Sequence, residues 1–398
     1  MTESEPAADA GRGSYALLST AIAAFFATMV ARIVISPLLP DVIDAFDATR
    51  GALGLALSGM WAGYAVMQFV GGVLGARYGE RPVIVAAIGL TGVASLGLSR
   101  AGSYPAFALM ALFLGASTGL YFSAGTTLLT RRFENTGGVL GLHSTGAPLA
   151  GLVGPVVAVA VAARWGWRSA LLLGAVVATP VFVLLVRQVG PTPPTAGDRP
   201  LREQVQPRRL ATILARPSIA YTVLLAVLVY FVWQTLYSFF PTFLVEHWGL
   251  SQRTASVLFG GVFAGTVVTL PVVGRLSDAV GRDALLAGAF TALAAGLTAL
   301  VVGERFPVAV AGCGLLALGM GFPGALNSRF MDHLSADERG RGFGLVRSIN
   351  LLLGSAGSAV TGSVADAVGW SVAFGLLPVL LAVAVGVMVW NRTSDAGL

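Results

Sequence analysis

Residues 371–390, SVAFGLLPVLLAVAVGVMVW, form twenty consecutive positions without a charged side chain. An α-helix rises 1.5 Å per residue, so about 20 apolar residues cross the roughly 30 Å hydrocarbon layer of a bilayer. Working outward from this run, similar runs occur at 15–36, 51–73, 82–99, 104–127, 138–161, 169–187, 218–240, 254–273, 284–302, 307–328 and 342–364. The sequence therefore predicts an all-α membrane protein with twelve transmembrane helices.

The composition of the whole chain agrees with this prediction. Hydrophobic residues make up 56% of the chain and charged residues 11%, whereas a soluble domain carries about 25% charge. The net charge of +6 comes from arginines that lie between the apolar runs and form no single basic patch. We therefore expect the lipid bilayer as the surrounding medium, no nucleic-acid partner, and a monomer.

The arginines concentrate in alternate connections between the runs, and this bias sets the predicted orientation. Connections on the cytoplasmic side of membrane proteins are enriched in basic residues, which places both termini of this multi-pass protein in the cytoplasm and the protein in the cell membrane. A proline-rich connection separates the two groups of six runs, and its second part, 208–216, predicts a short surface helix. The predicted organisation is a cytoplasmic tail (1–14), a six-helix bundle (15–187), a cytoplasmic linker (188–217), a second six-helix bundle (218–390) and a cytoplasmic tail (391–398).

The two halves of the chain repeat each other at a nearly constant offset. This offset in residue number holds over several landmarks, which indicates that a unit of six spans has been duplicated. Parallel repeats of this kind form two halves related by an axis along the membrane normal. We therefore expect two pseudo-symmetric six-helix bundles. The landmarks are 59–63 with 261–265 and Gly79 with Gly281 at an offset of 202, and Gly166–Trp167 with Gly369–Trp370 at an offset of 203.

The connection GRLSDAVGR at 274–282 resembles the signature loop of the major facilitator superfamily, G-x-L-x-D-x-x-G-R. Its counterpart, GVLGARYGER at 72–81, departs from that pattern, because Ala76 stands where an acid is usual and Glu80 where a basic residue is usual. The resemblance implies the fold of that superfamily and a role for Asp278 in holding a cytoplasmic gate shut, although a solvated loop acid is the alternative. The implied gating residues are Gly72, Arg77, Gly79, Arg81, Gly274, Asp278, Gly281 and Arg282.

Arg32 is the most informative residue within a span. A guanidinium at the centre of a membrane helix costs about 2.5–3.5 kcal/mol on insertion scales, so such a residue normally faces a cavity or a partner. Thr28, Arg32 and Ser36 are four residues apart and form one polar stripe. Their repeat equivalents, Tyr230, Gln234 and Ser238, form a second polar stripe on the seventh span. The alternative is that Arg32 extends outward or binds a carbonyl. The candidate substrate-binding residues are Arg32, Thr28, Ser36, Tyr64, Tyr121, Tyr230, Trp233, Gln234, Tyr237 and Asn327.

His143 and Arg347 lie near the inner ends of the repeat-related fifth and eleventh spans, and they are candidates for a proton or substrate relay. The alternatives are a structural histidine and an arginine that extends to the cytoplasm. A single cysteine and three widely separated histidines predict no metal site. No nucleotide-binding, metalloprotease or hydrolase motif occurs, so we expect neither an enzyme nor a bound cofactor.

These observations predict a secondary transporter that moves a small solute by alternating access. Arg32 has no acidic residue well inside any span to balance it, so an organic or inorganic anion is the predicted substrate, with a substrate carboxylate or phosphate as the partner of the guanidinium. One alternative is efflux of neutral hydrophobic compounds, for which the aromatic residues would matter more. Another is a non-transporting membrane sensor or scaffold. The direction of transport and the coupling ion stay open.

Overall fold

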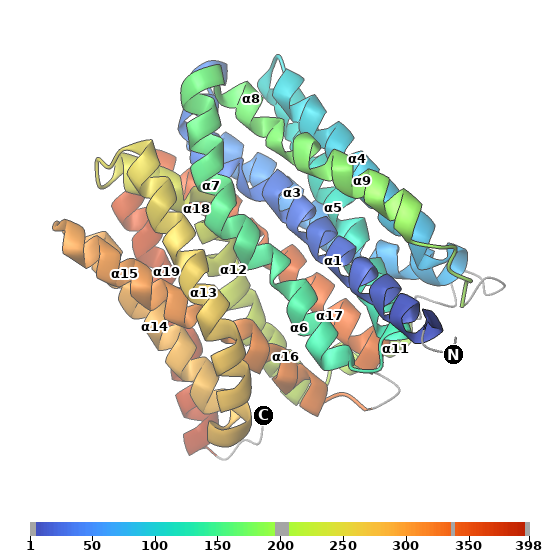
Figure 1. Ribbon diagram of the computed structural model, residues 1–398. Helices are drawn as coiled ribbons and strands as arrows, with labels where there is room; N and C mark the ends of the chain where they lie inside the picture. The colour runs from blue at the N-terminus through green and yellow to red at the C-terminus, as the bar shows by residue number, and fades with distance from the viewer. Residues whose placement is uncertain (1–4, 196–206, 336–338, 395–398) are drawn as a thin grey trace.

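The computed structural model describes the backbone of residues 5–195, 207–335 and 339–394, and the side chains within these ranges except those of 5–14, 207–210, 271, 274, 275, 277, 278 and 339–343. All regular structure in the described residues is helical (Figure 1). In chain order the elements are α1 (Glu5–Ile33), η1 (Ser36–Leu38), α2 (Leu39–Phe46), α3 (Arg50–Tyr78), α4 (Glu80–Arg100), α5 (Tyr104–Arg132), α6 (Thr136–Ser144), α7 (Gly146–Trp165), α8 (Trp167–Leu171), α9 (Leu173–Gln188), α11 (Pro207–Leu214), α12 (Pro217–Glu246), α13 (Gln252–Val280), α14 (Arg282–Val302), α15 (Phe306–Gly319), α16 (Phe322–Asp332), α17 (Arg339–Gly354), α18 (Ala356–Val368) and α19 (Trp370–Thr393).

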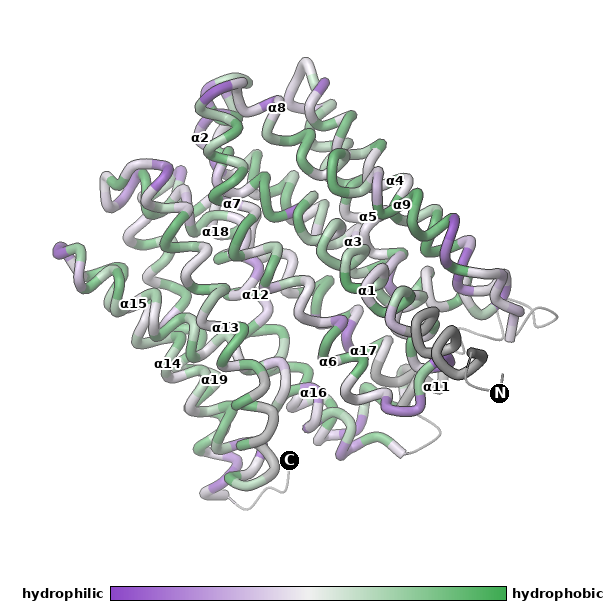
Figure 2. The backbone as a smooth tube through the Cα atoms, viewed as in Figure 1, coloured by the Kyte–Doolittle hydropathy of each residue, from purple (hydrophilic) through white to green (hydrophobic). Residues whose placement is uncertain are grey.

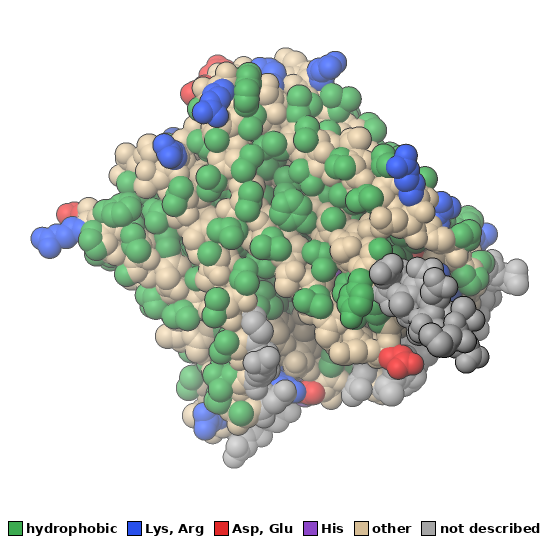
Figure 3. Space-filling view, viewed as in Figure 1, with side chains coloured by type: hydrophobic (Ala, Val, Ile, Leu, Met, Phe, Trp, Pro, Cys, Tyr) green, Lys and Arg blue, Asp and Glu red, His purple; other side chains and the backbone are tan. Residues whose placement is uncertain are grey.

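These elements make 12 candidate membrane spans among the described residues, which confirms the predicted all-α membrane fold with two six-helix bundles. The first span runs from Tyr15 to Phe46, because η1 and α2 continue it beyond Pro37 and Pro40. Figure 2 shows the helices coloured mainly as hydrophobic along their lengths, with hydrophilic residues at their ends. In Figure 3 hydrophobic side chains cover the middle of the visible face and charged side chains lie towards its edges, as a bilayer belt requires.

The repeat is visible in how helices begin and end. Gly79 and Gly281 adopt φ of +87° and +96° at the α3–α4 and α13–α14 junctions, and Gly166 and Gly369 adopt +81° and +88° at α7–α8 and α18–α19. Positive φ costs glycine little because it has no Cβ. These glycine pairs, predicted from the offset, therefore form equivalent sharp junctions in the two halves.

Equivalent hydroxyl side chains also cap the first turn of the second span of each half. Thr49 accepts a hydrogen bond from the backbone N–H of Ala52 at the start of α3, and Ser251 accepts one from Thr254 at the start of α13. Each cap satisfies a backbone donor that the first turn leaves free. The two caps lie at the same repeat offset, 202, as Gly79 and Gly281.

Twelve antiparallel spans give the molecule two ends. The Arg50 end carries Arg50 and the α7–α8 and α18–α19 junctions, and the terminal end carries both chain termini (Figure 1). The short helix predicted for 208–216 is α11, which lies at the terminal end, near α17 and the first turns of α12. Spans pack closely where glycines remove side chains: a Cβ on Gly115 of α5 would overlap the Met60 carbonyl of α3.

Candidate functional site

Arg32 lies at the end of α1, in the middle of the first span, and only 2% of its surface is exposed. Its guanidinium carbon is 3.8 Å from the centre of the Tyr64 ring and 5.1 Å from that of Trp61, both on α3. Cations within about 6 Å of an aromatic ring are attracted by the electron-rich face, most strongly when both are removed from water. The aromatic rings therefore provide part of the compensation that a buried charge requires.

Hydrogen bonds satisfy only part of the Arg32 guanidinium. Nε donates to the Thr28 carbonyl at 3.2 Å, and Nη2 contacts the Met29 sulfur at 3.2 Å, a weak acceptor. Nη1 is buried and has no partner among the described residues, and no described carboxylate forms an ion pair with Arg32. An unpaired buried donor costs about 1–3 kcal/mol, and more when the group is charged. The site thus contains one guanidinium nitrogen that is free to bind an acceptor.

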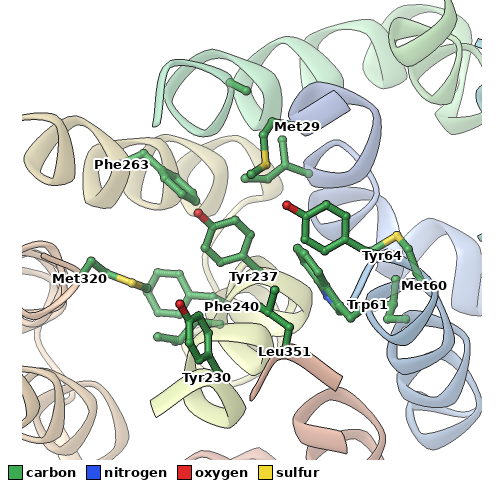
Figure 4. Close-up of a cluster of buried hydrophobic side chains, with 14 of the residues drawn as sticks. Met29, Met60, Trp61, Tyr64, Tyr230, Tyr237, Phe240, Phe263, Met320 and Leu351 are labelled. Carbon is green, nitrogen blue, oxygen red and sulfur yellow. The ribbon is translucent and has the colours of Figure 1, made fainter. Parts of the chain in front are cut away.

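Aromatic side chains from both halves of the molecule surround this guanidinium. Trp61 of α3 contacts Trp233 and Tyr237 of α12, with ring centroids 5.6 Å and 5.8 Å away. Figure 4 shows Trp61 and Tyr64 next to Tyr237, with Met29 nearby. Phe263 of α13 packs edge-on against Tyr237 at 5.0 Å. The surroundings of Arg32 are therefore an aromatic cage that joins the two bundles.

A group of serines closes the cage on the side of the Arg50 end. Ser36 Oγ donates to the Ser238 carbonyl at 2.8 Å, and these two residues are separated by the repeat offset of 202. The Ser238 hydroxyl is 2.7 Å from that of Ser358 on α18 and accepts a 3.3 Å bond from Trp61 Nε1. A residue and its repeat equivalent meet where the pseudo-symmetry axis passes between the bundles.

A second polar group lies towards the terminal end of the cage. Arg347 of α17 donates from Nε to Gln68 Oε1 of α3 at 3.3 Å, and its guanidinium lies 4.4 Å from the Phe122 ring centre. Gln234 donates to the Leu351 carbonyl at 2.9 Å. Three buried polar atoms here have no partner in the described structure: Gln68 Nε2, Gln234 Oε1 and Asn350 Oδ1. These atoms could bind the polar parts of a solute whose charge lies at Arg32.

The other predicted binding residues lie apart from the Arg32 guanidinium or point elsewhere. The Thr28 hydroxyl donates to the Phe25 carbonyl of its own helix at 2.8 Å. Tyr230 packs edge-on against Trp233 at 6.0 Å and belongs to the edge of the cage. Asn327, on α16, is half-buried, and its side chain makes no hydrogen bond with the described residues.

Tyr121 and His143 form a separate pair inside the first bundle. The Tyr121 hydroxyl donates to the Ala21 carbonyl at 2.7 Å and lies 3.0 Å from His143 Nε2. Since its only hydrogen goes to the carbonyl, the hydroxyl accepts from the imidazole, and Nδ1 is then the unprotonated nitrogen. That nitrogen is buried without a partner, and Phe25 stacks on the ring at 4.8 Å. The structure thus places Tyr121 with His143 and separates both from the Arg32 cage.

The first signature loop packs against the start of the central linker. Gly79 lies against the Thr192 carbonyl, which leaves no room for a Cβ. The Arg81 backbone N–H donates to Thr192 Oγ1 at 2.9 Å, and its side chain donates to the Val186 carbonyl at 3.0 Å. Arg77 lies 5.6 Å from the ring centre of Tyr78, and a Cβ on Gly72 would lie 3.4 Å from Ser123.

The second signature loop ends at Gly281, whose positive φ forms the junction with α14. Arg282 forms a 3.2 Å ion pair with Asp332 at the end of α16. Burial and the nearby Arg329 lower the pKa of His333, which follows α16. Gly274 and the Asp278 side chain lie outside the residues whose surroundings the structure describes, so the gating role of Asp278 stays a prediction.

Several contacts of the site were not anticipated from the sequence. Met29 lies beside the guanidinium, and Ser58 donates to the Ser355 carbonyl at 2.5 Å between the bundles. Their spacing carries no signal, because serine and methionine are common in apolar spans. Gln68 and Trp61 share a face of α3 with Tyr64, a pattern visible in the sequence, although the partners on α12 and α17 are not.

The twelve-span architecture, with a polar, aromatic cage between two repeat-related bundles, defines a polytopic membrane protein built from two similar halves. Residues 20–246 and 222–397 match the profile of the Major Facilitator Superfamily, and the chain belongs to this family. It is similar to a bacterial homologue of the human lysosomal transporter Spinster, solved in an inward-facing and unoccupied conformation. The TM-score is 0.79 and the identity 16%, with 98% of each chain covered.

Two curated relatives differ in what their names say they do. The chain is 30% identical over 155 residues to a probable sulfoacetate transporter of Cupriavidus necator, covering 38% of this chain and 36% of the relative. It is 27% identical over 164 residues to a membrane sensor protein of Salmonella typhimurium, covering 41% of this chain and 37% of the relative. The chain therefore spans little more than a third of the length of these relatives.

Proposed function

We propose that this protein is a secondary transporter that carries a small organic anion across the cell membrane by alternating access, with the anion bound at Arg32. The observation that carries the proposal is the unpartnered Arg32 Nη1, which is buried in the cage between the two bundles. A carboxylate, sulfonate or phosphate oxygen would supply the missing acceptor and the missing negative charge together. The similarity to a probable sulfoacetate transporter supports this substrate class.

The cage also limits the form of the substrate. Only one nitrogen of Arg32 is free, and the surrounding side chains are aromatic. A solute with one anionic group and a compact body that packs against Trp61 and Tyr237 fits this arrangement. The unpartnered Gln68 Nε2 and Gln234 Oε1 then provide a donor and an acceptor for hydroxyl or carbonyl groups of that body.

We further propose that the terminal end faces the cytoplasm, which is what the arginine bias predicts. In this orientation the Arg50 end, where ion pairs join the two bundles, faces outward. Reporter fusions at Gly190 and at Arg50 should then report the cytoplasm and the outside, respectively. A reporter at Gly190 that is active only outside the cell would contradict the orientation while leaving the anion site untouched.

The test of the anion site is substitution of Arg32 in purified protein reconstituted into liposomes, with sulfoacetate and short organic acids as the probes. Arg32→Gln should weaken binding by about tenfold to 100-fold, because a hydrogen bond to a charged group contributes about 1.5–3 kcal/mol. Arg32→Lys should recover only part of that loss, since lysine keeps the charge without the planar fork. Arg164→Gln, at an exposed arginine with no ion pair, is the matched control.

Two other functions remain in competition, and the same experiment separates them. The aromatic cage favours efflux of neutral hydrophobic compounds. This function predicts normal transport in both Arg32 variants and loss of transport in Trp61→Ala or Tyr237→Ala. The similarity to a membrane sensor favours binding without transport. A sensor would show an anion-dependent rise in melting temperature but no counterflow of the same anion across the liposome membrane.

A further inference from the structure

A groove of about 750 Å³ lies at the terminal end of the second bundle, well away from the Arg32 cage. It is formed where the end of α13 and the start of α14 meet α16 and the last turn of α19. Arg282, Arg329 and Arg392 line it together with a single acid, Asp283. None of these residues belongs to the transport site proposed above.

The charges in the groove are unevenly paired. Asp283 forms an ion pair with Arg329, and Arg282 forms one with Asp332 beside the groove. Arg392 is exposed and forms no ion pair among the residues that the structure describes. Among the described residues, the groove thus presents one guanidinium without an ion pair beside two that already contact carboxylates, and this arrangement attracts an anion.

The walls of the groove are apolar and continue onto the surface that faces lipid. Val280 and Val389 line it and are each 54% exposed. Val379 and Val383 of α19 are 58% and 52% exposed, so the outer face of this helix is apolar along its length. Trp390, next to Val389 and 58% exposed, is a side-chain type enriched at the level of lipid headgroups.

We propose that this groove binds the phosphate headgroup of an anionic phospholipid, with Arg392 as the residue that contacts the phosphate. Basic pockets between transmembrane helices on the cytoplasmic side suit such headgroups, and the apolar walls at Val280 and Val389 would hold the first part of an acyl chain. A free phosphate in water would use the arginines but gain nothing from these walls. The bound lipid would join α14, α16 and α19 at the end of the bundle.

The experiment measures the melting temperature of the full chain in nanodiscs of phosphatidylcholine, with and without roughly one fifth phosphatidylglycerol. A ligand that binds the native state raises the melting temperature, so phosphatidylglycerol should stabilise the unaltered protein. Arg392→Gln should lose at least about half of that rise, because it removes the guanidinium that contacts the phosphate. Arg187→Gln is the matched control, since Arg187 is an exposed arginine in the last turn of α9 at the same end, with no ion pair.

Three outcomes would overturn the proposal. Equal losses in Arg392→Gln and Arg187→Gln would show general attraction to an anionic surface instead of a site. An equal rise with millimolar inorganic phosphate in pure phosphatidylcholine would show a water-exposed anion site. An unchanged rise in Arg392→Gln would remove the residue from the site. If Arg392→Gln is already unstable in phosphatidylcholine, Val389→Asp, which removes the apolar wall, takes its place and should lose the rise in the same way.

Discussion

The two ends of the interface between the bundles differ in how they are held together. At the Arg50 end, Arg50 forms ion pairs with Glu246 and Asp366, and Gln252 donates to Asp41 at 2.8 Å. Further inward, Gly54 lies directly against the Ser358 carbonyl. Towards the terminal end, the bond between Arg347 and Gln68 is the one side-chain hydrogen bond between bundles that the described residues show.

This difference indicates how a protein of this family can keep the two bundles together at one end while they move apart at the other. At the Arg50 end, the bundles make a close backbone contact that requires the glycine at position 54. The ion pairs of Arg50 add electrostatic attraction, which acts over a longer distance than that contact. Among the side chains that the structure describes, the opposite end shows one long hydrogen bond, between an amide and a guanidinium. An alternating-access cycle requires that the strong set of contacts can be exchanged for others, so the contacts at the Arg50 end are the ones whose alteration should change the cycle most.

The largest effect is expected from Gly54→Ala. A Cβ on Gly54 would overlap the Ser358 carbonyl, whereas one on Gly59, a turn and a half further along α3, would meet nothing within 4 Å. Forcing a methyl group into backbone contact costs about 1–3 kcal/mol. Spin labels on Ala45 and Arg253 should show longer distances across the Arg50 end in Gly54→Ala, and the melting temperature should fall.

Gly59→Ala is the control for this substitution and should leave both measurements nearly unchanged. Identical behaviour of the two alanine variants would show that the glycine contact does not hold the Arg50 end closed.

A smaller effect is expected from Asp366→Asn. This carboxylate accepts hydrogen bonds from the backbone N–H groups of Arg50 and Gly51 at 3.0 Å and 2.7 Å. A residue of the second bundle therefore pairs two of the backbone donors that the first turn of α3 leaves free. Loss of the charge should cost about 1–2 kcal/mol in the free energy of unfolding. The measurement is thermal unfolding at low salt and at 1 M salt, where screening acts within about 3 Å.

High salt should reduce the difference between Asp366→Asn and the unaltered protein, because part of it comes from the ion pair with Arg50. Asp44→Asn, at an exposed acid that has no ion pair or hydrogen bond with the described residues, should leave the free energy of unfolding unchanged. A difference that grows with salt would contradict the electrostatic explanation.

The smallest effect is expected from Gln68→Ala, which removes the partner of Arg347. One such hydrogen bond contributes about 0.5–1.5 kcal/mol, and spin labels on Arg132 and Leu276 should show only a slight widening at the terminal end. A change as large as that of Gly54→Ala at the Arg50 end would mean that the two ends are held with similar strength.

The sequence predicted the fold well and the site only in part. Apolar runs of membrane-spanning length and the glycine pairs at fixed offset are properties of the chain itself, so the spans and the equivalence of Gly79 and Gly281 could be found from the sequence. Contacts between the bundles could not, because they depend on how the helices cross. Arg32 was identified as buried, yet the aromatic partners that surround it come from two other helices.

Two hydroxyl groups show why a polar stripe is an incomplete guide. Thr28 and Ser36 lie on the same side of the first span, but Thr28 Oγ1 bonds its own helix and Ser36 Oγ bonds Ser238. A hydroxyl in a helix can always turn back to a carbonyl three or four residues earlier, and residue spacing does not reveal that choice. The contact between Ser36 and Ser238 was accessible in principle, since residues near a symmetry axis meet their own copies.

The position of Arg32 also has a consequence for how the protein is made. Tyr64 follows Arg32 by only 32 residues, whereas Tyr237 follows it by 205. At about 5–20 residues per second, the ribosome completes Tyr64 roughly 2–6 s after Arg32, but Tyr237 only about 10–40 s after it. Until the second bundle is synthesised, α3 is the span that supplies the aromatic partners of Arg32, and the cage around the arginine closes only after α12 has been made.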